Sequence, residues 1–524
     1  MIIIYPHYDI KSGAGHYFRV LRLAYELKKN DEVIFILEKK NQIYYDKNFK
    51  HYYLKKNKDF VNKKKRTDAL CRFLSKFSKK ETKIIIDDYR IGLKEENKLK
   101  YLVNKVIIID DFINKPHYCD FYINFKNLSI PEKLKLKKNI PNKCKKIIGS
   151  NFAIINPKLK IKKKITKNLN ILFYAGGSGS MLFFSKIIKM ILKDNDLKKK
   201  VKVFIYFGNN SDGVNYFKYL KDKNRNLNLI FDKNNLETYL NKADLYFGHP
   251  GNSIYENSYL KLISLLFPVS QNQINSCHEL EKLGHYFIMK KKYINNIRLL
   301  DLIKKIINNI KSIRNNSFKN DSVNLKSPHL IAKIINKTEV SGNNLKDYNF
   351  SSTKRIKKSL GVKKIKFEEI NNYLSARNLN FNSKLMLNKK KIGSLDHYNW
   401  WLDNEFKSRN TFIYRAEDEV KVYIWHKKII IKNKSYLVGG WTTNNKNIKV
   451  TDVILSLKWQ LNETKKLKAT WLAVINKKNL FTLRLNKMLG FKLVVEKSYV
   501  EKLSKNYFGI KNKDYHILYY DYSS

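Results

Sequence analysis

The sequence contains little cysteine and no long apolar run. Its four cysteines form no CxxC pair, so we predict neither a zinc site nor a disulfide framework, and we expect a reducing compartment. No stretch approaches the roughly 18 uninterrupted apolar residues of a membrane-spanning helix, and Met1 leads directly into an apolar strand without a charged leader. We therefore expect a cytoplasmic protein that binds no metal and does not span a membrane. The cysteines are Cys71, Cys119, Cys144 and Cys277.

Acidic residues are also scarce: 45 Asp and Glu stand against 105 Lys and Arg, which gives a formal net charge of +60. A charge of this size often marks a nucleic-acid-binding protein. Here the basic residues are nearly all lysine and are spread evenly, and runs such as residues 63–66 and 389–391 are typical of solvated faces. The even spread is typical of nucleotide bias in an AT-rich genome, so we expect no specific nucleic-acid partner.

The chain is long enough for several domains, because it has 524 residues of which 43% are hydrophobic. Short apolar stretches alternate with helical patterns in two successive cycles, which predicts two doubly wound parallel sheets. A polar, Asn- and Lys-rich stretch without apolar periodicity then predicts a linker. The predicted segments are 1–165 (N-terminal Rossmann-like half), 166–337 (second, nucleotide-binding half), 338–361 (linker) and 362–524 (C-terminal module).

The first Gly-rich loop carries the strongest chemical signal. An Ile-rich strand at residues 2–5 leads into Gly13 and Gly15, and a helix follows, which is an arrangement that attracts anions such as phosphate. Phe18 stands where a dinucleotide fingerprint needs its third glycine, and His16 directly follows Gly15. A histidine in the first helical turn faces the positive end of the helix dipole, which favours neutral imidazole. We interpret His16 as a general base, the alternative being a histidine that caps the helix or packs.

Polar groups also follow later strands of the two cycles. Asp87 and Asp88 stand at the end of a strand, where a carboxylate can orient a base, bind a sugar hydroxyl or cap a turn, and we expect a functional role for one or the other. In the second cycle Gly176 and Gly177 follow a strand and precede a helix, which predicts a second phosphate cradle. We expect His249, next to a Pro-Gly turn, to be structural. The predicted strands of the two halves are residues 2–5, 32–38, 83–87, 105–110, 121–124, 171–174, 203–207, 227–231 and 244–247.

Together these motifs resemble the UDP-2,4-diacetamido-2,4,6-trideoxy-β-L-altropyranose hydrolases of pseudaminic (nonulosonic) acid biosynthesis. That family has the B-type glycosyltransferase fold, and the resemblance covers residues 1 to about 340. Where the family has Arg-x-Asp after its first strand, this chain has His7-Tyr8-Asp9. The matching motifs are Gly13-x-Gly15-His16-x-x-Arg19, Asp87-Asp88-Tyr89, Asp110-Asp111, Pro116-His117-Tyr118-Cys119-Asp120, Asn124, Gly176-Gly177, Glu256 and Gln273.

The resemblance implies hydrolysis of a UDP-amino sugar without metal or cofactor. UDP and a 2,4-diacetamido-2,4,6-trideoxyhexose would be released, and His16 would be the base for the attacking water. The alternative is a glycosyltransferase of the same fold that uses a UDP-sugar donor. The substrate-binding residues that the match implies are Asp9, Gly13, Gly15, Arg19, Asp88, Gly176, Gly177, Ser253, Glu256 and Gln273.

The C-terminal module resembles the GNAT superfamily of N-acetyltransferases. The resemblance rests on Glu368-Glu369, on residues 373–378, on His397-x-x-Trp400-Trp401, and on Asn479, Thr482 and Leu489-Gly490-Phe491. It implies an α/β domain that uses acetyl-CoA, so that the whole chain would be bifunctional and would N-acetylate the 4-amino sugar before hydrolysis. The residues expected to bind acetyl-CoA are Trp441, Lys446, Lys449 and Asn479.

Two features of the module leave its activity open. The stretch 444–449, which corresponds to the pyrophosphate loop of the superfamily, has no glycine, and Asn486 stands where many members place a tyrosine acid. An active transferase and a relic are both compatible with this sequence. His397, Trp400 and Trp401 share one helix face, so we expect them in the core. The predicted elements are strands at 365–367, 412–416, 422–425, 429–431 and 436–441 and helices at 368–378 and 394–404.

Overall fold

The computed structural model forms two compact units. Unit 1 comprises Met1–Asn295 and Lys311–Thr353, and unit 2 comprises Asn296–Ile310 and Lys354–Ser524. The described residues are 1–8, 15–38, 45–54, 63–161, 168–177, 179–208, 211–231, 235–270, 273, 277–318, 323–336, 348–349, 361–405, 410–415, 421–431, 433–495, 498–510 and 514–522.

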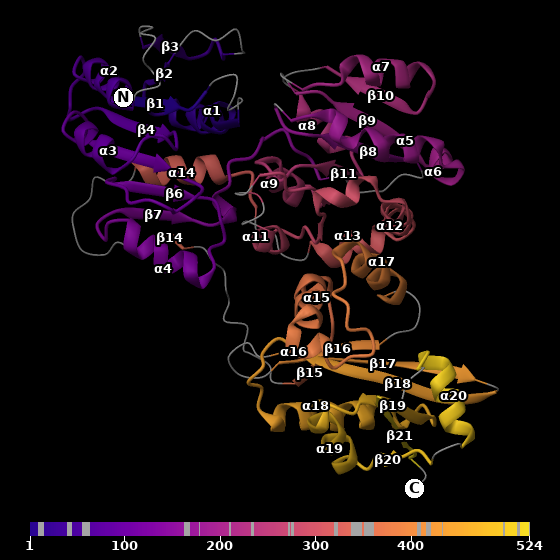
Figure 1. The fold of residues 1–524 in the computed structure, drawn as a ribbon. Helices are drawn as coiled ribbons and strands as arrows, with labels where there is room; N and C mark the ends of the chain where they lie inside the picture. The colour runs from indigo at the N-terminus through magenta and orange to yellow at the C-terminus, as the bar shows by residue number, and fades with distance from the viewer. Residues whose placement is uncertain are drawn as a thin grey trace. The chain divides into compact units, whose positions relative to one another are not determined.

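Unit 1 begins with a fully parallel sheet in the order β14-β7-β6-β5-β4-β1-β2-β3 (Figure 1). The strands β1 and β2 are buried along their whole length, as expected for apolar strands covered on both faces. Ile2 and Ile4 pack with α1, whereas Ile3 and Tyr5 pack on the opposite face with α2 and α3. The elements are β1 (Ile2–Pro6), α1 (Gly15–Leu27), β2 (Val33–Leu37), β3 (Lys50–Tyr53), α2 (Lys63–Leu74), β4 (Lys83–Asp87), α3 (Leu93–Lys100), β5 (Lys105–Ile109), β6 (Phe121–Asn124), α4 (Ile130–Asn139), β7 (Lys145–Ile148), η1 (Ser150–Phe152) and β14 (Tyr348–Asn349).

The second parallel sheet of unit 1 has the order β10-β9-β8-β11-β12-β13, with helices between its strands. Its strands are β8 (Leu169–Tyr174), β9 (Val201–Tyr206), β10 (Leu227–Ile230), β11 (Leu245–Gly248), β12 (Ile263–Leu266) and β13 (Phe287–Ile288). The other elements are η2 (Met181–Phe184), α5 (Ser185–Lys193), α6 (Asn195–Lys200), α7 (Val214–Asp222), α8 (Leu236–Lys242), α9 (Ser253–Tyr259), α11 (Cys277–Lys282), η3 (Lys291–Asn295), α13 (Ile310–Ser317) and α14 (Ser327–Asn336).

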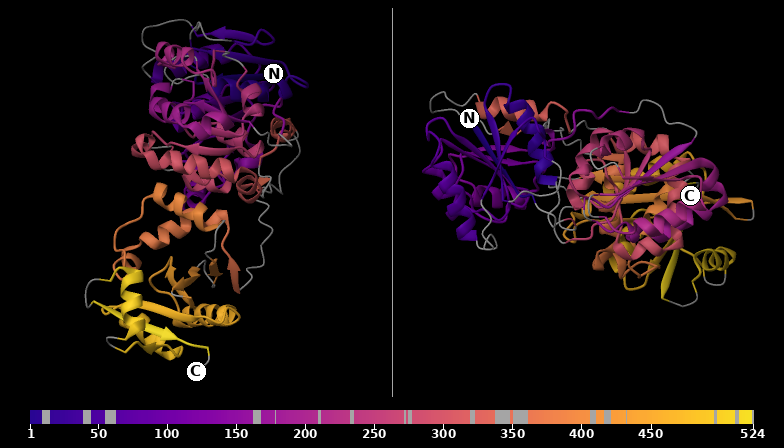
Figure 2. Two further views of the ribbon diagram at one scale, coloured as in Figure 1. Left: turned by 90° about the vertical axis from the view of Figure 1, so that its right-hand side faces the viewer. Right: turned by 90° about the horizontal axis from the view of Figure 1, so that it is seen from above.

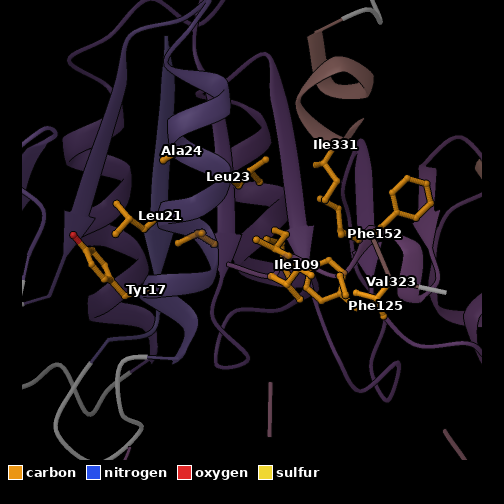
Figure 3. Packing of buried hydrophobic residues seen from close by; sticks show 14 of the residues in the cluster. Tyr17, Leu21, Leu23, Ala24, Ile109, Phe125, Phe152, Val323 and Ile331 are labelled. Carbon is orange, nitrogen blue, oxygen red and sulfur yellow. The ribbon is translucent and has the colours of Figure 1, made fainter. Parts of the chain in front are cut away.

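The helix α1 is held firmly by its apolar face. Tyr17, Leu21 and Ala24 recur at helical spacing and are buried in one cluster, which Figure 3 shows together with Ile331 of α14. Because this face fixes the rotation of α1, the polar residues of its first turn are placed beside the carboxyl ends of β1 and β4.

Unit 2 contains a mixed sheet in the order β15-β16-β17-β18-β19-β21-β20 (Figure 1). Figure 2 shows the same sheet, in orange to yellow, from two further directions. Its pairs are antiparallel except β18 with β19, which run parallel and pair only between Tyr436–Val438 and Thr470–Leu472. Beyond that point the two strands part. The elements are α12 (Ile297–Asn308), β15 (Gly361–Lys364), η4 (Phe367–Glu369), α15 (Ile370–Asn378), α16 (Asn380–Ser383), α17 (Ser394–Glu405), β16 (Asn410–Arg415), β17 (Lys421–Ile431), β18 (Lys434–Thr443), α18 (Val450–Lys465), β19 (Thr470–Asn476), α19 (Leu480–Met488), β20 (Lys492–Leu493), α20 (Tyr499–Phe508) and β21 (Tyr515–Tyr520).

The predicted α/β fold class, two Rossmann-like halves followed by a further α/β module, is confirmed. The GNAT likeness of that module stays a prediction. Several element boundaries differ. The strands predicted at 422–425 and 429–431 are one strand, β17, because its polar centre pairs with β18 and stays in the ladder. The strand predicted at 365–367 lies earlier, as β15, and Phe367 starts η4. The linker call at 338–361 falls outside the described residues except for β14 and Gly361, and the four domain boundaries stay predictions.

Candidate functional site

Three side chains meet where β1 gives way to α1. Nδ1 of His16 lies 2.7 Å from Oδ1 of Asp87, the last residue of β4, whose side chain is fully buried. Arg19 donates to both oxygens of the same carboxylate, from Nη2 to Oδ1 at 2.6 Å and from Nε to Oδ2 at 2.8 Å. Positions 16 and 19 share one face of α1, and β4 pairs with β1 so that Asp87 lies opposite Pro6. The fold therefore brings a histidine and an arginine onto one carboxylate.

The charge of Asp87 decides the tautomer of His16. Burial raises the pKa of Asp87, but the charge of Arg19 and the hydrogen bonds from Arg19 and His16 outweigh burial and lower it to about 2. A carboxylate that stays ionised can only accept a hydrogen bond, so Nδ1 of the imidazole is assigned as the nitrogen that carries hydrogen. No hydrogen bond from a described residue reaches Nε2 of His16, and its side chain is 15% exposed. A neutral ring in this state offers Nε2 as a proton acceptor.

Arg19 holds this arrangement from behind. Its Nη1 donates to Oδ2 of Asp111 at 2.8 Å, and the hydroxyl of Tyr89 donates to the same oxygen. The Tyr89 ring meets His16 edge-on, with 4.7 Å between ring centroids. Because Arg19 is buried and all three of its nitrogens contact protein groups, its described contacts are those of a residue that positions the carboxylate. The prediction that it binds substrate stays a prediction.

Asp88 lies in a neighbouring ionic cluster. Its carboxylate accepts from the guanidinium of Arg90, which also donates to Glu38. Burial raises the pKa of Asp88, but its hydrogen bonds from Arg90 and the charge of that residue lower it overall. These contacts are structural, and its predicted role toward a sugar hydroxyl stays untested. Asp9 and Gly13, the remaining candidates of this half, lie outside the described residues.

A cavity of about 1030 Å³ lies within unit 1 and is lined by both of its halves. Gly176 has a φ of +88°, which favours glycine, and a side chain at Gly208 would come within 2.5 Å of the Gly176 carbonyl oxygen. The turn therefore depends on close backbone packing.

His16 is not among the residues that line this cavity, although Gly15, the residue before it in α1, is. Of the predicted site residues, the cavity brings together Gly15, Arg19, Gly176, Gly177, Ser253, Glu256 and Gln273.

Glu256 connects the two halves of unit 1. Its Oε1 lies 2.9 Å from Nη1 of Arg22 and 3.4 Å from the backbone nitrogen of Asn156. Sequence reasoning missed Arg22, because a single arginine inside a helical pattern carries no distinguishing signal. Ser253 lies beside the Tyr246 hydroxyl at 3.3 Å, and Oε1 of Gln273 accepts from the Val269 backbone at 2.9 Å.

His249 also lines this cavity but has the contacts of a structural residue. Its Nδ1 lies 2.7 Å from the carbonyl oxygen of Phe267, and its ring stacks on Phe184. Burial lowers its pKa, so the neutral ring is favoured. The geometry therefore favours the structural interpretation.

Unit 2 has its own cavity of about 1100 Å³, at the point where β18 and β19 part. Trp441 lies in its wall with its ring edge toward Phe481, and Lys446 and Asn479 line it as well. Lys449 is not in the wall but is the N-cap of α18, without a side-chain capping bond. The N–H of Asp452 in this first turn already donates to the Lys449 carbonyl oxygen at 3.1 Å, so the N–H groups that can meet an anion are those of Val450 and Thr451.

The glycine-free loop before α18 is closed by side chains. The backbone nitrogen of Asn447 donates to Oδ1 of Asn445, and that of Asn445 donates to the Thr443 hydroxyl. Asn479 caps α19 by accepting from Thr482. On α17, His397 and Trp401 are buried as expected, whereas Trp400 is partly exposed, and Trp400 and His397 line the cavity.

Comparison with known proteins identifies one family. Residues 171–333 match the Glycosyltransferase family 28 C-terminal domain. This part of the chain is glycosyltransferase-like. The match covers less than half of the chain and lies in unit 1, and none of the curated proteins compared with the chain matches it.

Solved structures similar to the chain fall into two groups. MurG of Acinetobacter baumannii is 14% identical over 64% of this chain and 98% of its own, with a TM-score of 0.45. A UDP-N-acetylglucosamine 2-epimerase is 11% identical over 66% of this chain and 98% of its own, with a TM-score of 0.44. A putative phosphinothricin N-acetyltransferase is 16% identical over 32% of this chain and 100% of its own, with a TM-score of 0.26.

Two features are absent from the described residues. Within the part of the chain that the structure describes, no helix combines the length and apolar character needed to cross a membrane. In that same part, no cluster of three or more His, Cys, Asp or Glu side chains is arranged to hold a metal ion.

Proposed function

We propose that unit 1 hydrolyses the sugar–phosphate bond of a UDP-amino sugar, with His16 as the general base. The observation that carries this proposal is the 2.7 Å contact between Nδ1 of His16 and the buried, ionised carboxylate of Asp87. A carboxylate in this position orients the ring and stabilises the imidazolium that forms on proton transfer.

The reaction then follows from the tautomer of His16. Nε2 takes a proton from water while the water oxygen attacks the anomeric carbon of the sugar. The bond between that carbon and the diphosphate oxygen breaks, and UDP leaves with the electron pair. Asp87 does not take the proton, because its pKa of about 2 keeps it ionised at neutral pH. Since Gly15 lines the cavity and His16 follows it, the sugar would lie at the α1 end of the cavity.

The nucleotide would occupy the glycine-lined side of the same cavity. Gly176 and Gly177 leave open space where a side chain would stand, which allows a phosphate to approach the backbone. The buried carboxylate of Glu256 is an acceptor for ribose hydroxyls, with Ser253 and Gln273 nearby in the wall. A pseudaminic acid precursor, a UDP-2,4-diacetamido-2,4,6-trideoxyhexose, is the substrate that the motif resemblance favours.

A second candidate is sugar transfer to an acceptor hydroxyl, which the match to glycosyltransferase family 28 favours. The two are separated by incubating the full chain with a panel of UDP-diacetamido sugars without acceptor and measuring UDP and sugar by mass spectrometry. Hydrolysis predicts equal amounts of UDP and free sugar in the wild type and none with His16→Asn. UDP release that depends on an added acceptor would exclude hydrolysis and establish the transferase.

For unit 2 we propose N-acetylation of the amino sugar with acetyl-CoA as cosubstrate. The parting of β18 from β19, the open N-terminus of α18 and the side chains of Trp441, Lys446 and Asn479 support a binding site for it. Calorimetric titration of the folded full chain with acetyl-CoA tests this proposal. Absence of binding would leave unit 2 as a relic that no longer transfers acetyl groups.

A further inference from the structure

Arg22 is placed where neither the motif resemblance nor the family match assigns a residue. It extends from α1 in the first half of unit 1 and contacts Glu256 on α9 in the second half. Its side chain is 26% exposed and lies in the wall of the 1030 Å³ cavity. This cation therefore faces the space that would hold a nucleotide.

The described contacts of the Arg22 side chain are made by one nitrogen of its guanidinium, Nη1. Nη1 lies 2.9 Å from Oε1 of Glu256 and donates to the carbonyl oxygen of Ile154 at 3.4 Å. The contacts given for the described residues leave Nη2 and Nε without a protein partner. A guanidinium has five N–H donors in a planar fork that fits phosphate oxygens in pairs. The ion pair with Glu256 holds the fork in one orientation, so little conformational entropy remains to be lost when an anion binds.

The other cations of the cavity are placed differently. The guanidinium of Arg19 donates its hydrogen bonds to Asp87 and Asp111. Lys29 lies beyond the end of α1, is 62% exposed and pairs with Glu26. Lys158 and Lys326, the other lysines of the cavity wall, are exposed as well. Arg22 combines partial burial, a fixed orientation and unspent donors, and it shares the cavity wall with the open Gly176–Gly177 turn.

We propose that Arg22 binds the phosphate groups of a nucleoside diphosphate held by the second half of unit 1. The inference rests on the proposed function, because it assumes that the cavity receives a nucleotide. In this arrangement Arg22 of α1 binds the diphosphate, while Glu256 binds the nucleoside. Binding of the ligand is thus shared by the two halves.

The test compares two probes, UDP and uridine, by isothermal titration calorimetry on the full chain. Arg22→Gln removes the charge, and we expect about 10- to 100-fold weaker UDP binding, the range for a lost charge-assisted hydrogen bond, with uridine binding unchanged. Arg22→Lys keeps the charge without the fork and should fall between. Lys29→Gln is the matched control, a neutralised cation of the same cavity, and should leave both affinities unchanged.

Each other outcome has a definite meaning. Equal losses for UDP and uridine in Arg22→Gln would show that Arg22 acts only through Glu256, and would overturn the inference while leaving the nucleotide site intact. Wild-type protein that binds neither probe would end both this inference and the proposed function. If Arg22→Gln does not fold, Arg22→Lys decides: weaker UDP binding with unchanged uridine binding supports the inference, because the charge remains and only the fork is lost, whereas unchanged UDP binding or an equal loss of both ligands contradicts it.

Discussion

Replacement of Asp87 by asparagine is the sharpest test of the catalytic arrangement. In the structure Oδ1 accepts from both His16 and Arg19, and Oδ2 accepts from Arg19. An asparagine amide has only one accepting oxygen. If its nitrogen faces Arg19, two donors oppose each other; if it faces His16, Nδ1 must become the acceptor and hydrogen moves to Nε2. Either orientation breaks a bond, and the second removes the base.

The expected magnitudes follow from these contacts. Loss of general-base catalysis lowers kcat by about 10²- to 10⁴-fold. Removal of one partner of a buried ion pair costs about 3–5 kcal/mol of unfolding free energy. The assay is UDP release under saturating substrate, with kcat and KM determined separately, next to urea unfolding monitored by circular dichroism. Since Asp87 does not bind substrate in this scheme, KM should change little.

Asp111→Asn provides the control for this experiment. It removes the other acidic partner of Arg19 without touching His16, so we expect a loss of stability with a much smaller effect on kcat. If Asp87→Asn turns over at nearly the wild-type rate, the assignment of His16 as a base oriented by Asp87 is wrong. If both variants lose kcat equally, the effect belongs to Arg19 and not to the tautomer of His16.

Four further outcomes are expected. The pKa of Asp87 is lowered to about 2 from an ordinary 3.8, so its ionised form contributes stability at neutral pH that is lost as pH falls from about 4 to 2. Urea unfolding at each pH should show a loss of unfolding free energy that is roughly 2 kcal/mol larger in wild type than in Asp87→Asn. Burial raises the pKa of Glu279 to about 8, so its protonated form stabilises the fold below pH 4.5 and this contribution is lost as pH rises toward 8. The unfolding free energy of Glu279→Gln should therefore rise by about 4 kcal/mol relative to that of the wild type between pH 4.5 and 8. An equal effect of the substitution at both pH values would contradict the burial argument. Gly439→Ala places a side chain within 2.4 Å of the Trp425 carbonyl oxygen and should destabilise unit 2 by about 1–3 kcal/mol in calorimetric unfolding while UDP release by unit 1 persists. All six tryptophans lie between residues 400 and 471 and four line the unit 2 cavity, so acetyl-CoA should change tryptophan emission and UDP should not; a UDP-induced change alone would place nucleotide binding in unit 2.

Local sequence patterns were sufficient to predict most of the fold. Ile-rich runs such as residues 2–5 and 83–87 are strands in the structure, because parallel strands covered on both faces need unbroken apolar runs. The short strands β3 and β7 were missed, since lysines at their ends and half-exposed positions weaken the apolar signal.

The candidate site was predictable only one residue at a time. The glycine loop pointed to His16, but its partner Asp87 is 71 positions away, and only the pairing of β1 with β4 selects it from the neighbouring Asp88. Arg22 and Glu256 meet across two halves whose sequences contain no signal of the contact. Likewise Cys119 and Cys144, separated in sequence, lie with their sulfur atoms 3.3 Å apart. Such pairs depend on strand order, which local periodicity does not encode.

The helix α1, thirteen residues long, contains both His16 and Arg22 and packs against α14 through its apolar face. In the proposed function, proton abstraction by His16 and binding of the leaving nucleotide by Arg22 are therefore coupled, since neither side chain can be displaced along the helix axis without the other. Substitutions on the buried face of α1, for instance at Ala24, are expected to lower turnover and nucleotide affinity together. An engineer who wished to tune one property alone would have to change the residues that face α1 rather than α1 itself.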